Sequence, residues 1–412
     1  MAVPKLRFKG FENEWFQHKI GDFFEHLATG STPSRIDSDY FKGDIPWISS
    51  GELKSHYVSS TKEYITEKAV KDTNLKIYPP GTMFIAITGL EAKGTRNSAA
   101  INTIPMTTNQ SCLAFPLNDL LNLDFLYYWY KKNGEKIGIT YTQGTKQQSL
   151  TPGLVKNLDI VLPSIEEQAK IAQFFNLIEL KIEHQKEKID LLKEQKKGFM
   201  QKIFNQELRF KDEDGQAFPE WEKKPLGDLG EFGVSYSYSR SCEGEGLVQH
   251  IHYGDIHTKL PTICDKVQFP SITEQRDFEF VNDGDILFAD ASEDYNDLGK
   301  AILIRSLQSV KTVAGLHTHK FIPKESVYPL YLIYVTQTKG YREFIKKMGT
   351  GVSVLGISKT NLAKFDILLP SLNEQIKIGE FLFSFDQKIH SLNSQLDYLS
   401  SQKQAFMQQM FI

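Results

Sequence analysis

Residues 162–204 return without a gap at residues 369–411, so the chain contains an internal duplication. The first copy reads LPSIEEQAKIAQFFNLIELKIEHQKEKIDLLKEQKKGFMQKIF and the second LPSLNEQIKIGEFLFSFDQKIHSLNSQLDYLSSQKQAFMQQMF. About 18 of about 43 aligned positions are identical at one constant offset, far more than two unrelated helical segments would share. This repeat constrains the fold most, because whatever structure one copy forms the other is expected to form as well.

Each copy is predicted to be a long amphipathic helix, because its apolar seam advances by alternating steps of four and three residues. The seam positions are Ile171, Phe175, Ile178, Ile182, Gln185, Ile189, Leu192, Lys196, Phe199 and Ile203, matched by Ile378, Leu382, Phe385, Ile389, Leu392, Leu396, Leu399, Lys403, Phe406 and Met410. The stripe is narrow and runs along roughly 48 Å of helix at about 1.5 Å per residue. We therefore expect the two helices to pair with each other, the alternative being a helix packed on its own domain.

Both helices begin in the same way. Ser164 with Glu167, and Ser371 with Glu374, follow a proline in the S-x-x-E pattern of a capping box. The start of each helix is therefore predicted together with its phase.

The duplication extends beyond the helices. Leu6–Lys9 recurs as Leu208–Lys211, and Gly21-Asp22 recurs as Gly227-Asp228. We predict a domain at residues 1–163, a helix at 164–205, a second domain at 206–370 and a second helix at 371–412. The fold class expected is α+β, with two tandem-duplicated α+β domains separated by two long antiparallel coiled-coil helices.

Within each domain the similarity is weaker, but strand and helix signals recur. Turns lead into short buried strands at 80–87 and 283–289, and further strands are expected at 158–162 and 365–369. One helical region is expected per domain, at 123–132 and 328–347. The aromatic residues Tyr127 to Tyr130 are interpreted as core rather than as a platform for stacking bases.

Composition is that of an ordinary soluble protein, with 40% hydrophobic and 24% charged residues among 412. No apolar run approaches the ~20 residues of a membrane span, so no membrane association and a cytoplasmic location are expected. Cys112, Cys242 and Cys264 show no CxxC spacing. Because the net charge is −3, a surface for nucleic acid has to be a local concentration of basic side chains.

Enzyme signatures are mostly missing: the chain has no N-P-P-Y tetrapeptide, no P-loop and no G-x-G-x-x-G after a strand. Glu91 and Lys93 form a lone E-x-K, a weak nuclease signal. Five histidines near Cys264 suggest zinc, although polar loop histidines are the favoured interpretation. They are His250, His252, His257, His317 and His319. No catalytic or metal site is predicted.

The paired L-P-S-x-x-E-Q-x-K-I openings, together with the two Gly-Asp pairs, resemble the specificity subunit of a type I restriction–modification enzyme. The resemblance covers the whole chain. It implies two target-recognition domains, each reading one half of an interrupted site in double-stranded DNA, and no catalytic centre or cofactor in this chain. It also implies two modification subunits that carry S-adenosylmethionine and two restriction subunits that use ATP and Mg. The alternatives are a DNA-modifying enzyme with unrecognised catalytic residues and a coiled-coil scaffold that binds no nucleic acid.

Base readout is predicted in polar loops, because arginine and lysine suit guanine while glutamine and asparagine suit adenine. The candidates are Arg35, Lys93, Arg96, Asn97, Lys146, Gln147 and Gln148 in the first domain, and Tyr236, Tyr238, Arg240, His252, His317 and His319 in the second. Docking of the modification subunits is predicted at polar residues that recur where each helix begins. These are Glu167, Gln168, Lys170, Glu374, Gln375 and Lys377.

Overall fold

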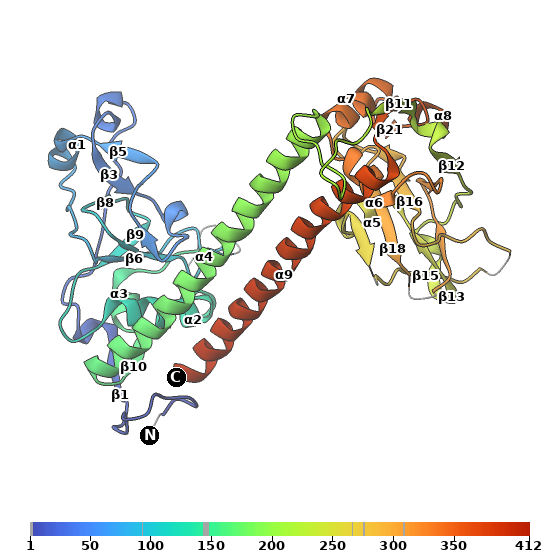
Figure 1. Ribbon diagram of the computed structural model, residues 1–412. Coiled ribbons are helices and arrows are strands. Elements are labelled where there is room, and N and C mark those ends of the chain that lie inside the picture. Colours follow the sequence, from blue (N-terminus) through green and yellow to red (C-terminus); the bar gives the residue numbers. More distant parts are fainter. Residues whose placement is uncertain (1–2, 93, 143–147, 266, 275–276, 308–309) are drawn as a thin grey trace. The chain divides into compact units, whose positions relative to one another are not determined.

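The computed structural model describes residues 3–92, 94–142, 148–265, 267–274, 277–307 and 310–412. The chain divides into two compact units. Unit 1 contains Met1–Lys186 and Ser394–Ile412, and unit 2 contains Glu187–Asn393. Each unit therefore holds one globular domain, the start of the long helix that follows that domain, and the end of the other long helix (Figure 1).

The domain of unit 1 is built on two small sheets. The five-stranded sheet has the order β2 (Ala28–Thr29), β9 (Cys112–Phe115), β6 (Met83–Ala86), β7 (Ala99–Asn102) and β4 (Tyr57–Val58). The three-stranded sheet has the order β5 (Glu63–Ile65), β3 (Ile45–Ile48) and β8 (Thr107–Thr108). β1 (Phe16–Lys19) pairs with β10 (Asp159–Leu162), and the helices are α1 (Glu67–Asp72), α2 (Leu123–Tyr141) and α3 (Pro152–Lys156).

The domain of unit 2 repeats this plan. Its five-stranded sheet has the order β12 (Gly230–Phe232), β20 (Thr318–Pro323), β16 (Ile286–Ala289), β18 (Ala301–Ser306) and β14 (Ile263–Asp265). Its three-stranded sheet has the order β15 (Ser271–Ile272), β13 (Glu243–Ile251) and β19 (Thr312–Ala314). β11 (Glu222–Pro225) pairs with β22 (Asp366–Leu369), and β17 (Ala291–Ser292) with β21 (Leu355–Gly356). The helices are α5 (Tyr253–Thr258), α6 (Pro329–Val335), α7 (Lys339–Met348) and α8 (Lys359–Leu362). Two tandem α+β domains are thus confirmed.

The helical region expected at 328–347 is two helices instead of one. α6 ends at Val335 and α7 begins at Lys339, because the Thr338 hydroxyl accepts a hydrogen bond from the Tyr341 amide and so caps a new helix. In unit 1 the aromatic run Tyr127 to Tyr130 lies in α2 and is buried. Its assignment to the core is therefore confirmed.

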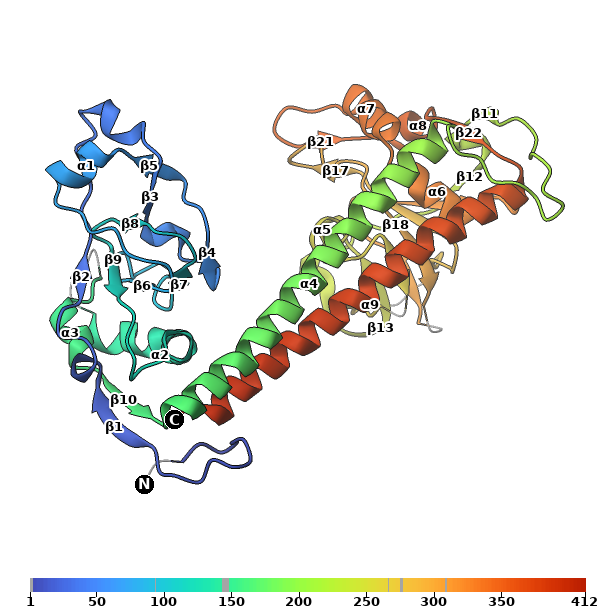
Figure 2. The ribbon, with the colours of Figure 1, turned by 60° about the vertical axis from the view of Figure 1, so that its left-hand side comes forward.

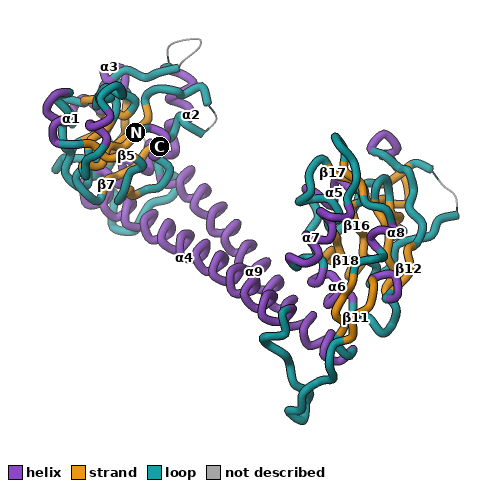
Figure 3. The backbone as a smooth tube through the Cα atoms, turned by 90° about the horizontal axis from the view of Figure 1, so that it is seen from above, coloured by secondary structure: helices purple, strands orange, loops and turns teal. Residues whose placement is uncertain are grey.

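The two long helices are α4 (Ile165–Phe204) and α9 (Leu372–Met410), drawn in purple in Figure 3. Every predicted seam position is buried or half-buried. In unit 1, Gln185 donates a hydrogen bond to Gln395, and Glu179 pairs with Lys403. Since the residue number rises along one helix while it falls along the other, the helices are antiparallel, as predicted.

Unit 2 contains the end of α4 and the start of α9, which pair in the same way. Lys196 lies 2.7 Å from Asp386, which also accepts a hydrogen bond from the Tyr334 hydroxyl at 2.6 Å. The rings of Phe199 and Phe385 pack against each other one turn away. The seam lysine repeated in both helices therefore has an acidic partner on the opposite helix in each unit, which stabilises one antiparallel register.

The first turn of each long helix contains a buried glutamate that pairs with an arginine, and the capping box predicted there is not complete. Glu167 and Glu374 are 1% and 0% exposed. The guanidinium of Arg7 holds Glu167 through two bonds of 2.7 Å, and Arg209 holds Glu374 at 2.9 and 3.2 Å. The capping prediction is half right in α4, where the Ser164 hydroxyl accepts the Glu167 amide at 3.4 Å. It is wrong for both glutamate side chains, because arginine is the stronger partner for a buried carboxylate.

The following glutamine joins each long helix to its own domain. The Gln168 side chain accepts the Asn122 amide at 2.9 Å, where α2 begins, and donates to the Pro163 carbonyl at 3.0 Å. Gln375 makes the same two bonds, to the Tyr328 amide and the Pro370 carbonyl. The glutamate and glutamine of both helices are thus buried and bonded inside the chain, so their exposure does not support partner docking there, which stays a prediction. Lys170 is exposed and Lys377 half-buried, and docking there stays a prediction.

The Arg209–Glu374 pair is expected to stabilise unit 2 strongly. Replacing Arg209 by Met leaves the buried Glu374 carboxylate without its cation, which costs about 3 kcal/mol of unfolding free energy. Hydrogen exchange of unit 2 peptides measures this loss separately from unit 1. Lys223→Met, which removes the exposed Lys223–Asp366 pair, is the control and should leave protection unchanged. Equal effects of the two substitutions would contradict a special role for the buried pair.

Candidate nucleic-acid interface

Strand pairing brings several loops of unit 1 to one edge of the five-stranded sheet. β2 is antiparallel to β9, β9 to β6, and β6 to β7. The carboxyl ends of β2 and β6 therefore meet the amino ends of β9 and β7. We call the segments 30–35, 87–92, 94–98, 109–111 and 148–150 the loop edge of unit 1. Backbone hydrogen bonds connect them, including Ile87 to Ser111 at 2.9 Å and Leu150 to Ile87 at 2.8 Å.

Unit 2 has a matching loop edge, composed of the segments 233–240, 290–300, 315–317 and 349–357. β12 is antiparallel to β20, β20 to β16, and β16 to β18. The Asp290 amide donates to the His317 carbonyl at 3.0 Å, and the Ile357 amide donates to the Asp290 carbonyl at 2.9 Å. The second bond corresponds to that between Leu150 and Ile87. The duplication has therefore preserved the edge, while the side chains on it differ.

In unit 1 the structure brings together Arg96 and Gln148 at the loop edge. Nη2 of Arg96 lies 3.4 Å from the Gln148 side-chain oxygen, and Nη1 donates to Glu135 at 2.6 Å. The Asn97 carbonyl accepts a hydrogen bond from Lys131, so its backbone is fixed against α2. Lys93, Lys146 and Gln147, also predicted to read bases, lie outside the described residues.

Arg35 lies on the segment that leaves β2. Its guanidinium forms a fork with the Glu63 carboxylate at 2.5 and 2.8 Å and lies 4.3 Å from the centre of the Phe41 ring. The hydrogen bond from Arg35 lowers the pKa of Glu63. The arginine is exposed, and its contacts hold the planar donor group in a defined orientation.

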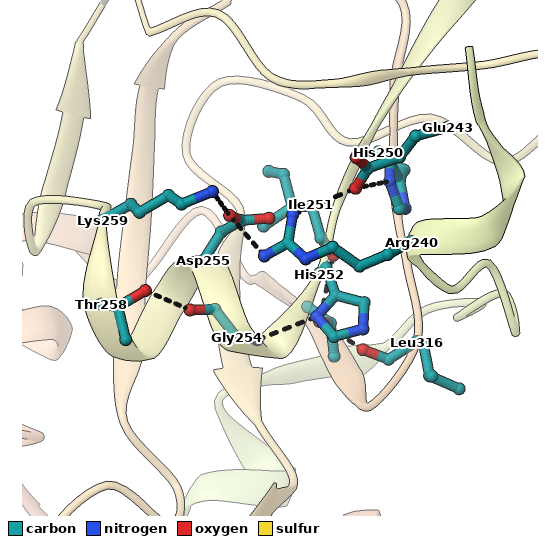
Figure 4. Close-up of polar contacts among 11 residues, drawn as sticks. Arg240, Glu243, His250, Ile251, His252, Gly254, Asp255, Thr258, Lys259 and Leu316 are labelled. Carbon is teal, nitrogen blue, oxygen red and sulfur yellow. Dashed lines mark hydrogen bonds and ion pairs between the residues drawn. The ribbon is translucent and has the colours of Figure 1, made fainter.

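In unit 2, Arg240 is held by two acidic residues (Figure 4). Its guanidinium donates to Asp255 at 2.9 Å and to Glu243 at 3.1 Å, while His250 lies 3.3 Å from the same Glu243 oxygen. Burial raises the pKa of Asp255, but the hydrogen bonds and positive charges of Arg240 and Lys259 together outweigh burial, so the net shift of this pKa is downward. Arg240 thus pairs with an ionised carboxylate while its side chain stays partly accessible at 43%.

Three histidine and tyrosine candidates of unit 2 are largely buried. Tyr238 and His252 are 6% and 7% exposed. Nε2 of His319 donates a hydrogen bond to the Ile357 carbonyl oxygen at 3.0 Å, and 13% of the His319 side chain is exposed. His252 accepts the Gly254 amide and caps α5. These three side chains are mostly buried within the domain, where His252 and His319 bond to backbone groups, so base contact by them stays a prediction without support from their exposure.

Two other candidates of unit 2 remain accessible. Tyr236 is half-buried, stacks on Tyr238 and accepts the Glu279 amide through its hydroxyl. His317 has half of its side chain exposed, adopts a positive φ of 52° and lies 2.9 Å from Asp290. The edge of unit 2 therefore presents Arg240 and His317 to solvent.

Sequence reasoning missed Thr32, Gln110 and Asn296. Thr32 and Gln110 share a hydrogen bond of 2.5 Å across the edge of unit 1, and Asn296 is exposed in the segment between β16 and β18. The turn-and-strand signals at 80–87 and 283–289 locate the central strand of each sheet. Gln110 becomes a candidate only when β9 is known to pair with that strand.

The described residues form no group that would bind a metal ion. No three histidine, cysteine, aspartate or glutamate side chains described by the structure are grouped closely enough to hold a metal ion. Burial raises the pKa of Cys264 to about 12, which keeps its thiol protonated. Glu91 accepts the Gln148 amide at 2.9 Å and thereby joins two loops. In the part of the chain that the structure describes, no helix is long and apolar enough to cross a membrane.

Comparisons with known proteins agree on one family. The model of the type I restriction modification DNA specificity domain matches twice, at residues 12–194 and 219–399. The MjaIX specificity subunit of a type I restriction enzyme from Methanocaldococcus jannaschii is 33% identical over 228 residues, 52% of this chain and 51% of that protein. The chain thus spans about half the length of this relative. The MjaVIII specificity subunit from the same organism is 23% identical over 96% of this chain and 91% of its own length.

A solved structure has the same fold. The crystal structure of a type I restriction-modification system S subunit from M. genitalium covers 100% of this chain and 99% of its own, with a TM-score of 0.63 and 16% identity. The two matches to the family model span most of the sequence and coincide with the two repeats. The chain therefore belongs to the type I restriction modification DNA specificity domain family.

Proposed function

We propose that this chain is the DNA-recognition subunit of a type I restriction–modification complex. Each domain reads one half of an interrupted site in double-stranded DNA through its loop edge, and the chain itself catalyses no reaction. The observation that carries the proposal is the duplicated edge, where the backbone is matched between the units and the exposed side chains are not. A matched frame with different side chains suits two unlike half-sequences.

The exposed groups have the chemistry of base readout. Unit 1 presents Arg35 and Gln110, and unit 2 presents Arg240 and His317. An arginine held in place by carboxylates is a preorganised bidentate donor for guanine, and a glutamine pairs similarly with adenine. Glu63 holds Arg35, while Asp255 and Glu243 hold Arg240.

Partners supply the other activities in this proposal. Two modification subunits bring S-adenosylmethionine, and two restriction subunits bring ATP and Mg. The net charge of −3 supports such a division, because phosphate contacts dominate DNA affinity and need more basic surface than the chain as a whole carries. Lys170 and Lys377 are proposed as contacts for the two modification subunits, since they occupy equivalent accessible places on the two helices.

Selection from random duplexes tests the proposal. The chain assembled with its modification subunits is expected to enrich two short, unlike sequences separated by a fixed number of unread base pairs. Methyl transfer by the chain alone would support the enzyme alternative. Failure of the assembled complex to enrich any sequence would support the scaffold alternative.

The two arginines are expected to act on separate half-sites. Arg35→Ala should weaken binding to the first half-site, and Arg240→Ala to the second, each by about 1–3 kcal/mol for the cognate base pair. Binding to duplexes with single base-pair changes measures both effects. Lys42→Ala, which removes an exposed lysine paired with Asp39, is the control. An equal loss on all sequences would assign these arginines to phosphate contact.

The helices are proposed to set the gap between the half-sites. Four residues inserted after Leu192 lengthen α4 by about 6 Å, close to one turn, so the favoured gap should grow by one or two base pairs of about 3.4 Å. Both half-sequences should stay the same. Four residues inserted between Glu213 and Asp214, in an exposed loop, are the matched control and should leave the gap unchanged. If the favoured number of base pairs between the half-sites does not change after the insertion in α4, this role is contradicted.

A further inference from the structure

The segment 349–356 of unit 2 carries two exposed valines. Val352 is 100% exposed and Val354 is 61% exposed. At the base, the Thr350 and Gly356 backbones exchange hydrogen bonds of 2.9 and 2.7 Å. Gly351 has a φ of 130°, and a Cβ there would lie 2.0 Å from the Val354 carbonyl oxygen, so glycine is required in this turn. The backbone thus holds two apolar side chains in solvent instead of folding them inward.

This turn is part of the loop edge of unit 2. β21 pairs with β17 at its base (Figure 2), with Ala291 opposite Gly356 and Ser292 opposite Leu355. The adjoining Asp290 accepts the Ile357 amide through its carbonyl and binds His317 through its side chain. The turn that carries the valines is therefore joined through Asp290 to the segment that presents His317.

The equivalent place in unit 1 has different chemistry. There the segment before Leu150 carries Lys146, Gln147 and Gln148, of which only Gln148 lies among the described residues. In unit 2 the segment reads GTGVSVLG and contains no charged residue. The turn in unit 2 thus has neither a cation for a phosphate nor an amide side chain for a base edge, and its exposed apolar surface is formed by the methyl groups of Val352 and Val354, next to the hydroxyls of Thr350 and Ser353.

We propose that Val352 and Val354 contact the C5-methyl groups of thymine in the second half-site; this rests on the proposed function. The thymine methyl is the apolar feature that a base pair presents in the major groove. Valine is stiff about χ1, so little side-chain freedom is lost when its methyls are placed against a base. The second half-site accordingly contains at least one A·T pair.

Replacing thymine by uracil removes this methyl and nothing else. With the chain assembled on its modification subunits, uracil at one or more positions of the second half-site should weaken binding about threefold to tenfold. The double variant Val352→Ser with Val354→Ser should bind the thymine site weaker by a similar factor and no longer distinguish uracil from thymine. Val352→Thr with Val354→Thr, closer in shape, should show an intermediate distinction. Leu120→Ser, which removes an exposed apolar residue beyond the other end of β9, should leave the distinction intact.

Unchanged readout of the first half-site shows that the valine variants are folded and assembled. A serine variant that still distinguishes uracil from thymine would overturn the proposal, as would a second half-site without A·T pairs. Loss of assembly with the modification subunits, without any change at thymine, would assign the valines to a protein interface and overturn it as well. If the wild-type complex selects no sequence, the proposed function itself fails.

Discussion

Each unit depends on the ion pair between an arginine and the buried glutamate at the start of its long helix. A carboxylate that is almost fully removed from water is tolerated only with a close cation, so Glu167 requires Arg7 and Glu374 requires Arg209. Each arginine directly follows a leucine, Leu6 or Leu208, and the backbone amide of this leucine donates a hydrogen bond to the end of the other long helix. Leu6 donates to the Gln409 carbonyl, and Leu208 donates to the Lys202 carbonyl. In each unit the ion pair and the leucine hydrogen bond together connect the segment before the domain, the start of one long helix and the end of the other.

Unit 1 and unit 2 reach this arrangement through different chain paths. In unit 2, Leu208 lies only six residues after Lys202 along the chain. In unit 1, Leu6 and Gln409 are almost the whole sequence apart, yet they make the same bond. The end of α9 accordingly packs on the first domain, with Met407, Met410 and Phe411 in its core, much as Ile203 at the end of α4 enters the core of the second. Antiparallel pairing of the helices follows, because each domain holds the start of one helix and the end of the other.

Much of this architecture could be predicted from the sequence, since repeats and heptad seams are local patterns. The long helices, the two α+β domains and the buried aromatic run of α2 are of this kind. The burial of the glutamate and glutamine of each helix could not be predicted, because recurrence alone does not distinguish a docking residue from a buried one. Arg7, the partner that decides the matter, lies 160 positions before Glu167. The burial of Tyr238 and His252 could not be predicted for the same reason, because loop residues are buried here through contacts with residues distant in the sequence.

The candidate surface was predictable in part. Arg35, Arg96 and Arg240 were found from residue type and loop position, whereas the edge that collects them depends on strand order. That order places β9 beside β6 and β20 beside β16, and nothing in the spacing of the strands along the chain indicates it. Gln110 was missed for this reason. Conversely, the sequence alone does not indicate a role for the uncharged turn with Val352, because the full exposure of this valine is known only from the structure.

Cross-linking to DNA tests most directly the claim that the two loop edges contact separate half-sites. In a Cys242→Ser background, which removes the one cysteine that is not buried, cysteine is placed at Gln110 or at His317, and thiol-tethered bases scan the duplex. The account predicts that Gln110→Cys captures bases of the first half-site and His317→Cys captures those of the second. Cysteine at Leu120 or Glu325, beyond the opposite ends of β9 and β20, should capture neither. Capture at these opposite ends, or of one half-site by both edge positions, would contradict the account.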